Sequence, residues 1–162
     1  MTAAQVGFAY TNGFSVSNEG ITNIQYRSTD RAGNVETIKN ITIQIDKTAS
    51  TITLTANPST IRSPNGKPVT VQLRGTGSDA VSGLASVSYT VTDEYGTSLS
   101  IPTRTLSGNS ANWTDSIDLE ASRRGDDLDG RLYRITATIT DMAGNTSTAT
   151  ADIVVAHDQR NH

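Results

Sequence analysis

The sequence predicts an all-β protein in which antiparallel strands pack face to face as a sandwich. Three observations support this fold class: apolar and polar residues alternate in most segments, turn-forming residues separate those segments, and apolar side chains are scarce. Hydrophobic residues make up 35% and aromatic residues 5% of the 162 residues. This composition suits a thin core of aliphatic side chains between two sheets. It does not suit an enzyme with a deep apolar cleft.

An internal repeat of strand, tight turn and strand is the first element of this organisation. Segment 28–34 closely matches segment 139–145, and each copy follows one alternating strand and leads into another. Both copies contain the pattern Asp-x-Ala-Gly-Asn, in which Asp accepts backbone hydrogen bonds while Gly and Asn tolerate positive φ. We therefore expect two hairpin turns in which six residues have structural roles: Asp30, Gly33, Asn34, Asp141, Gly144 and Asn145.

Further strand candidates lie between the two copies. Apolar residues alternate with polar ones in three segments, 51–56, 69–74 and 87–92, and Trp113, Ile117 and Leu119 share one face of a segment near 112–119. Turn-forming stretches separate them, among them the glycine-rich residues 75–83, which we interpret as a loop. With the second hairpin, these segments give about seven short strands, the number and spacing typical of an immunoglobulin-like sandwich. We expect a complete antiparallel immunoglobulin-like β-sandwich over residues 48–157.

Residues 1–47 predict only a partial immunoglobulin-like unit. They contain closing strands, and the alternation stops at Ile45. We interpret residues 46–48 as a linker and residues 158–162 as a disordered tail. A half sandwich leaves one apolar face and one strand edge open, which favours pairing with another chain. Two interpretations stay open: the unit is truncated, or a neighbouring chain completes it.

The sequence also resembles known bacterial modules. Residues 14–48 resemble the end of an OmpL47-type bacterial Ig-like repeat, through YRSTDRAGNVE at 26–36 and IDKT at 45–48. Ser50 stands where that family usually has Pro. Residues 50–159 resemble an Ig-like or fibronectin-III-like module of large secreted bacterial proteins, through SPNGK, DEYG, ASRRGDDLDGR and HDQ. The resemblance implies an extracellular or cell-surface spacer, stalk or binding module.

Charge and composition exclude several classes of partner and site. The net charge is −3 without a basic run, which disfavours nucleic acid as a partner. The chain contains no cysteine, so disulfides and cysteine-based zinc sites are excluded. No apolar stretch is long enough to insert into a membrane. Residues 1–20 lack the pattern of an export signal, so we expect that signal to lie outside this chain.

The richest acidic segment predicts a calcium site. Asp126, Asp127 and Asp129 lie close together before Gly130, and hard cations such as Ca²⁺ prefer carboxylate ligands. The pattern is not that of an EF-hand, because the later Glu is missing. The alternative is a solvated loop in which the Asp side chains cap turns and pair with nearby arginines, contacts that contribute little when exposed.

A second calcium candidate is the junction between the two units. Asp46 lies in the predicted linker, and Asp79 lies in a loop expected to project from the second unit. The resemblance implies this site, since some bacterial Ig-like adhesin arrays use Ca²⁺ at such junctions. The alternative is a flexible linker whose Asp residues cap turns.

Catalysis is not expected. The two histidines, His157 and His162, lie at the C-terminal end, where neither is held as a catalytic base must be. Trp113 and Tyr133 are in phase with apolar positions, so we expect both to be buried. This leaves Tyr95, in a loop, as the one candidate platform for stacking on a sugar ring.

Three functions remain open at this point. The first is a structural or adhesive surface module whose partners are neighbouring domains of a larger chain or a surface protein, with Ca²⁺ as the one candidate cofactor. The second is an accessory module that binds a glycan or protein for a larger enzyme. The third is an assembly subunit whose incomplete unit pairs with strands of another copy.

Overall fold

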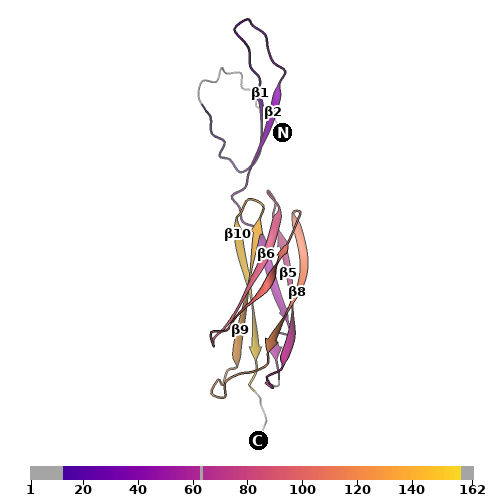
Figure 1. The fold of residues 1–162 in the computed structure, drawn as a ribbon, viewed down its shortest axis with the longest axis vertical. Helices are drawn as coiled ribbons and strands as arrows, with labels where there is room; N and C mark the ends of the chain where they lie inside the picture. Colours follow the sequence, from indigo (N-terminus) through magenta and orange to yellow (C-terminus); the bar gives the residue numbers. More distant parts are fainter. Residues whose placement is uncertain (1–12, 63, 158–162) are drawn as a thin grey trace. The chain divides into compact units, whose positions relative to one another are not determined.

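The computed structural model describes residues 13–62 and 64–157, so the predicted tail at 158–162 lies outside the described residues. The described residues form strands and no helix, which confirms the all-β class. The chain divides into two compact units after Lys47 (Figure 1). We call Met1–Lys47 unit 1 and Thr48–His162 unit 2.

Unit 2 is a sandwich of two sheets. Its strands are β3 (Thr51–Asn57), β4 (Thr60–Ile61), β5 (Pro68–Ser78), β6 (Leu84–Asp93), β7 (Ser98–Thr105), β8 (Ser110–Glu120), β9 (Arg131–Asp141) and β10 (Thr146–Val155). One sheet has the order β4-β10-β9-β6-β7 and the other the order β3-β5-β8. All neighbouring pairs are antiparallel except β4 and β10, which run parallel.

The core of unit 2 lies between the sheets, where the alternating apolar residues meet. Strand β9 shows the pattern clearly, because Tyr133, Ile135 and Ile139 are all buried. Trp113 of β8 is also buried, as its phase with the apolar positions predicts. Alternation at a period of two therefore places these side chains inside.

Two glycines predicted to lie in a loop belong instead to β5. Gly75 and Gly77 are part of the ladder with β8, so the interpretation of the stretch from residue 75 as a loop is wrong at its start. A Cβ on Gly75 would lie 2.3 Å from the Trp113 ring, and one on Gly77 would lie 2.4 Å from Ile139 Cδ1. The missing side chains make room for the largest core residues, which local turn propensity does not reveal.

In unit 1, strands β1 (Gly20–Tyr26) and β2 (Lys39–Ile45) form an antiparallel pair. Cross-strand partners put aliphatic residues on one face, with Ile24 opposite Ile41. The other face is polar, and there Thr42 Oγ1 donates a hydrogen bond to Asn23 Oδ1. Several large apolar side chains of the unit are exposed: Phe14, Ile21, Tyr26, Val35, Ile38 and Ile41.

Candidate functional site

Aspartate turns close both repeated hairpins. The Oδ1 atom of Asp141 accepts hydrogen bonds from the backbone N–H groups of Ala143 (2.9 Å) and Asn145 (2.8 Å). Asp30 does the same with Ala32 and Asn34, both at 2.9 Å. In each turn the Asn side chain donates to Oδ2 of the Asp, and the Gly before the Asn has positive φ.

The same turn occurs a third time between β6 and β7. Asp93 Oδ1 accepts hydrogen bonds from the N–H groups of Tyr95 (3.0 Å) and Thr97 (2.7 Å), and Gly96 has positive φ. The internal sequence repeat does not reveal this third turn, because the turn lacks the Ala and Asn of the other two. The signal that would have found it is an Asp three residues before a Gly at a strand end.

Asp79 and Asp141 lie close together in unit 2. Both carboxylates are buried, and an oxygen of one lies within 4.8 Å of an oxygen of the other. Asp79 also accepts hydrogen bonds from the N–H groups of Val81 and Gly83, so it caps a turn like Asp141. Two buried carboxylates at this spacing are hard oxygen ligands of the kind that Ca²⁺ takes. Asp46, the other predicted junction residue, directly follows β2 at the end of unit 1.

The structure does not bring Asp126, Asp127 and Asp129 together as a set of metal ligands within the described residues. Asp127 instead accepts hydrogen bonds from the Tyr95 hydroxyl and from the Gly130 N–H. The hydrogen bond from Tyr95 is the main cause that lowers the pKa of Asp127 below its ordinary value. Asp127 therefore acts as a turn and loop anchor.

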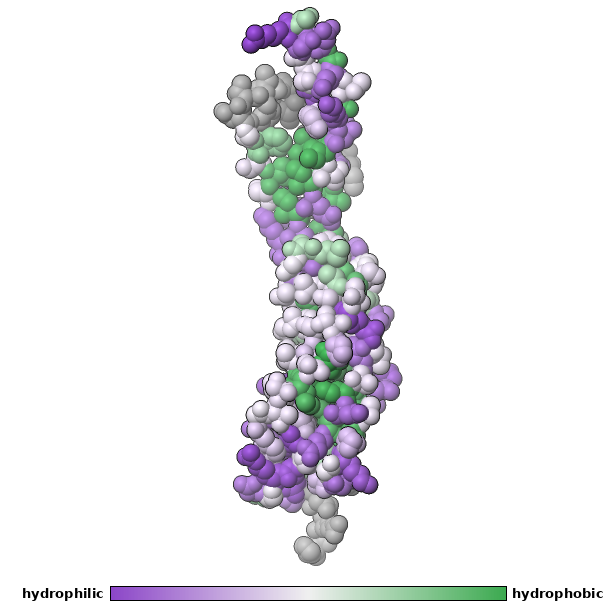
Figure 2. Space-filling model, in the orientation of Figure 1, coloured by the Kyte–Doolittle hydropathy of each residue, from purple (hydrophilic) through white to green (hydrophobic). Residues whose placement is uncertain are grey.

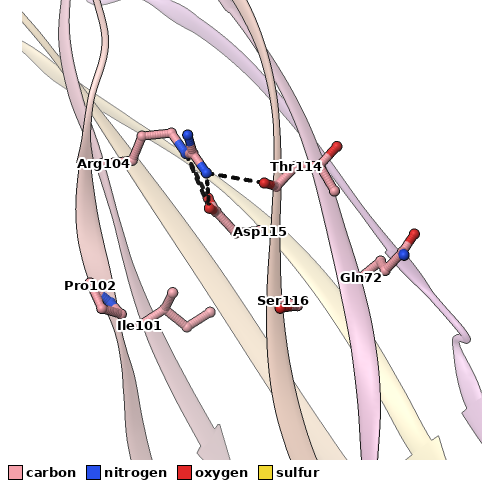
Figure 3. A pocket seen from close by; sticks show the side chains of 7 residues that line it. All are labelled: Gln72, Ile101, Pro102, Arg104, Thr114, Asp115 and Ser116. Atoms are coloured by element: carbon pink, nitrogen blue, oxygen red, sulfur yellow. Dashed lines mark hydrogen bonds and ion pairs between the residues drawn. The ribbon is translucent and has the colours of Figure 1, made fainter.

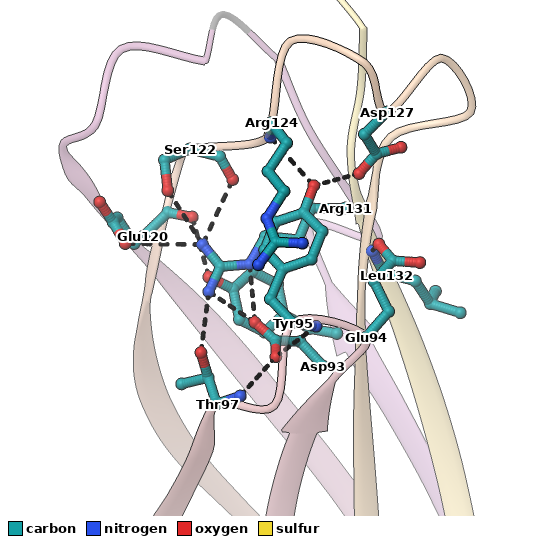
Figure 4. A network of polar contacts seen from close by, with 11 residues as sticks. Asp93, Glu94, Tyr95, Thr97, Glu120, Ser122, Arg124, Asp127, Arg131 and Leu132 are labelled. Atoms are coloured by element: carbon teal, nitrogen blue, oxygen red, sulfur yellow. Dashed lines mark hydrogen bonds and ion pairs between the residues drawn. The ribbon is translucent and has the colours of Figure 1, made fainter.

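Arg131 is the centre of a buried polar network at this end of unit 2 (Figure 4). Its guanidinium forms an ion pair with Asp93, and the side chains of both residues are buried. It also donates to Ser122 Oγ at 2.9 Å and contacts Glu120 at 3.5 Å. Burial alone would raise the pKa of Asp93, but hydrogen bonds from Arg131 and Thr97 outweigh it and lower that pKa. The network ties the β6–β7 turn to the segments before and after the acidic loop.

Tyr95 belongs to this network and is only partly exposed. The guanidinium carbons of Arg124 and Arg131 lie 4.4 Å and 5.0 Å from the centre of its ring. Arg131 also lies 4.4 Å from the ring centre of the buried Tyr133. Such cation–π contacts hold the ring in place. They do not favour the prediction of Tyr95 as an exposed platform for a sugar.

A groove lies between β7 and β8, the free edges of the two sheets in unit 2 (Figure 3). It measures about 480 Å³, and its lining residues are Gln72, Ile101, Pro102, Arg104, Thr114, Asp115 and Ser116. Arg104 of β7 reaches across to form an ion pair with Asp115 of β8. Asp115 accepts a further hydrogen bond from the Tyr89 hydroxyl at 2.8 Å, and Trp113 Nε1 donates to that hydroxyl at 2.6 Å. Burial is the first cause that raises the pKa of Tyr89 above its ordinary value.

None of these arrangements forms a familiar catalytic site. The most buried charged groups bind each other or cap turns, and these contacts stabilise the fold. His157 follows the end of β10, and His162 lies outside the described residues. Among the described residues, no helix is long and apolar enough to cross a membrane.

The comparisons with known proteins agree with this architecture. A model of the bacterial Ig-like domain matches residues 1–66 and again residues 63–158. Domains of this family are generally non-enzymatic modules and are often extracellular. No curated protein matches the chain. The two matches together cover nearly the whole sequence, and the chain therefore belongs to the family of bacterial Ig-like domains.

Proposed function

We propose that this chain is a non-catalytic structural or adhesive module at the bacterial cell surface or in a secreted protein. In this proposal, residues 14–48 end an OmpL47-type repeat, and the following residues form the next module of an array. The observation that carries it is the use of buried polar groups in unit 2. Asp93, Arg131 and Asp141 fix turns and loops, which is the role expected of polar groups in a scaffold.

Localisation in a bacterium that carries the gene tests this proposal. An antibody against unit 2 should label intact cells or the culture medium, and external protease should remove the label from cells. The matched control is a cytoplasmic protein probed in the same samples. A signal confined to the cytoplasmic fraction would reject the surface role.

Recognition of a glycan or protein is the second candidate, and the groove between β7 and β8 favours it. Its lining combines an ion pair, hydroxyl groups and an amide, which are groups that contact sugars and peptides. A glycan array probed with the purified chain is the test. Binding that Asp115→Asn weakens would support it, and no signal on the array would leave the scaffold function.

Calcium remains part of the proposal, since a cation would offset the repulsion between the neighbouring carboxylates of Asp79 and Asp141. Melting curves in calcium and in EDTA test it. We expect a higher melting temperature in calcium, and a smaller difference in Asp79→Asn than in Asp129→Asn, which changes the acidic loop. Superimposable curves would reject a tight stabilising site.

A further inference from the structure

Of the two sheet edges that flank the groove, β8 is the less protected. Strand β7 contains Pro102, which has no N–H group, and its pairing with β6 shifts register between Val87 and Tyr89. Strand β8 pairs with β5 in one register along its whole length and contains neither Pro nor Lys. Proline, lysine and bulges are the usual means of protecting an edge from another strand. Edge β8 lacks all three, and its one inward-pointing charge, Asp115, is already paired with Arg104 of β7.

The backbone of β8 also points toward an incoming strand. Arg104 Nη2 donates a hydrogen bond of 3.1 Å to the carbonyl oxygen of Thr114, so this carbonyl faces away from β5. In an antiparallel ladder the direction of the backbone groups alternates, so Ser116 and Asp118 direct theirs the same way. The backbone groups of Ser116 and Asp118 are positioned to pair with an added strand, whereas the Thr114 carbonyl already accepts its hydrogen bond from Arg104.

The apolar core opens to solvent beside the same edge. Leu99 and Ile101 of β7 pair with Val91 and Tyr89, which are buried, and therefore share their inward-facing side of the sheet. Leu99 is nevertheless 38% exposed, while Ile101 and Ile117 are half-buried. A strand added to β8 would cover these apolar side chains, which gives the contact a favourable hydrophobic contribution.

The hairpin of unit 1 has the complementary features. On β2, aliphatic residues at alternate positions share one face, and Ile41 on this face is 49% exposed. Asn40, Thr42 and Gln44 share the other face, as polar residues do on β8. The space-filling view shows hydrophobic residues gathered over this hairpin (Figure 2). Among the described residues, strand β2 has one neighbouring strand, β1, in a two-stranded sheet.

From these features we propose that the free edge of β8 and the groove beside it bind the β1–β2 hairpin of a second copy of this chain. Strand β2 adds antiparallel to β8, and the apolar face of the hairpin covers the opening at Leu99 and Ile117. This direction brings Lys39, at the start of β2, to the acidic end of β8 at Asp118 and Glu120. The inference goes beyond the proposed function, because it assigns a partner and the surface that binds it.

Light scattering coupled to size-exclusion chromatography of the full chain tests the inference. The mass of the wild-type protein should rise with concentration above that of one chain, 17.2 kDa. Ser116→Pro removes an outward N–H that β5 does not use, and Ile41→Lys puts a charge on the apolar face of the hairpin. We expect both variants to keep the mass of one chain at every concentration.

Thr53→Lys is the matched control, because it lies on β3, at the opposite edge of the same sheet, and is exposed. It should associate like the wild type. A wild type that stays monomeric, or a folded Ser116→Pro that associates like the wild type, overturns the inference. If Ser116→Pro shows no thermal transition, and so does not fold, the other variant decides. Ile41→Lys that associates like the wild type then overturns the inference. Cell-surface localisation is measured separately and does not depend on this result.

Discussion

Arg131 is a residue whose environment depends mainly on contacts with other segments of the chain. The sequence places it at the end of an acidic, polar loop, where a solvated arginine is the natural expectation. In the structure it is buried, forms ion pairs with Glu120 and with Asp93, which is 38 residues away, and stacks on two tyrosine rings. No local pattern encodes such contacts, so sequence alone could not predict this network.

Replacement of Arg131 should therefore destabilise unit 2. Arg131→Met leaves the buried Asp93 carboxylate without its cation, which should lower the free energy of unfolding by about 3–5 kcal/mol. Arg131→Lys should have a smaller effect, because it keeps the charge but loses the planar hydrogen-bonding geometry. Urea unfolding measures the free energy of unfolding of both variants.

The control is Arg134→Met, which breaks an exposed ion pair with Asp152 and should change stability by no more than about 1 kcal/mol. Equal effects of Arg131→Met and Arg134→Met would contradict the structural role of the network.

Acid should destabilise unit 2 through Asp93. Its pKa in the folded state is lowered, so the unfolded state takes up a proton first as the pH falls. The stabilisation is complete above the unfolded-state pKa of about 3.9 and is lost as the pH falls through the folded-state pKa. The free energy of unfolding, measured by urea titration at a series of acidic pH values, should fall less steeply in Asp93→Asn. Parallel profiles would contradict this prediction.

At the scale of elements, the strands of unit 2 were predictable because burial repeats at every second residue. Strand β9 follows this rule from Tyr133 to Ile139, and its residues lie in the core as expected. Strand β5 keeps the same burial period, but glycines stand at its buried positions 75 and 77, because the Trp113 ring and the Ile139 side chain fill that space. The turn at Asp93 was missed for a related reason, since its geometry depends on Asp and Gly but not on the residues between them.

Gly75→Ala tests the packing of β5 against β8. The added methyl group would overlap the Trp113 ring, and such overpacking should cost about 1–3 kcal/mol of stability. Thermal unfolding followed by tryptophan fluorescence reports on both the stability and the ring environment. Ser78→Ala, at an exposed site on the same strand, is the control, and a Gly75→Ala protein as stable as this control would contradict the packing.

The two repeated hairpins offer a matched pair of turn mutations. Asp141→Ala removes a buried acceptor from two backbone N–H groups, which should cost unit 2 about 1–3 kcal/mol. Asp30→Ala makes the same change in an exposed turn of unit 1 and should leave the unfolding midpoint of unit 2 unchanged. Chemical denaturation of both variants tests this prediction. A lower unfolding midpoint of unit 2 in Asp30→Ala would contradict it.

At the scale of the whole molecule, the two units differ in how completely they bury their apolar residues. The core of unit 2 consists of residues from Leu54 to Val155, whereas Ile21 and Ile41 of unit 1 remain exposed. A protein shortened to residues 48–162 should therefore fold by itself, with the cooperative thermal transition that the full chain shows for unit 2. Circular dichroism checks this, and a shortened protein without cooperative melting would show that unit 2 depends on unit 1.

The parallel pairing of β4 with β10 has a mechanical consequence. The N–H groups of Val154 and Ala156, near the end of unit 2, donate to the carbonyl groups of Ser59 and Ile61, near its start. Tension applied to the two ends of the unit pulls these parallel segments in opposite directions along their length. The hydrogen bonds between them are then loaded together in shear, which resists rupture better than opening them one at a time.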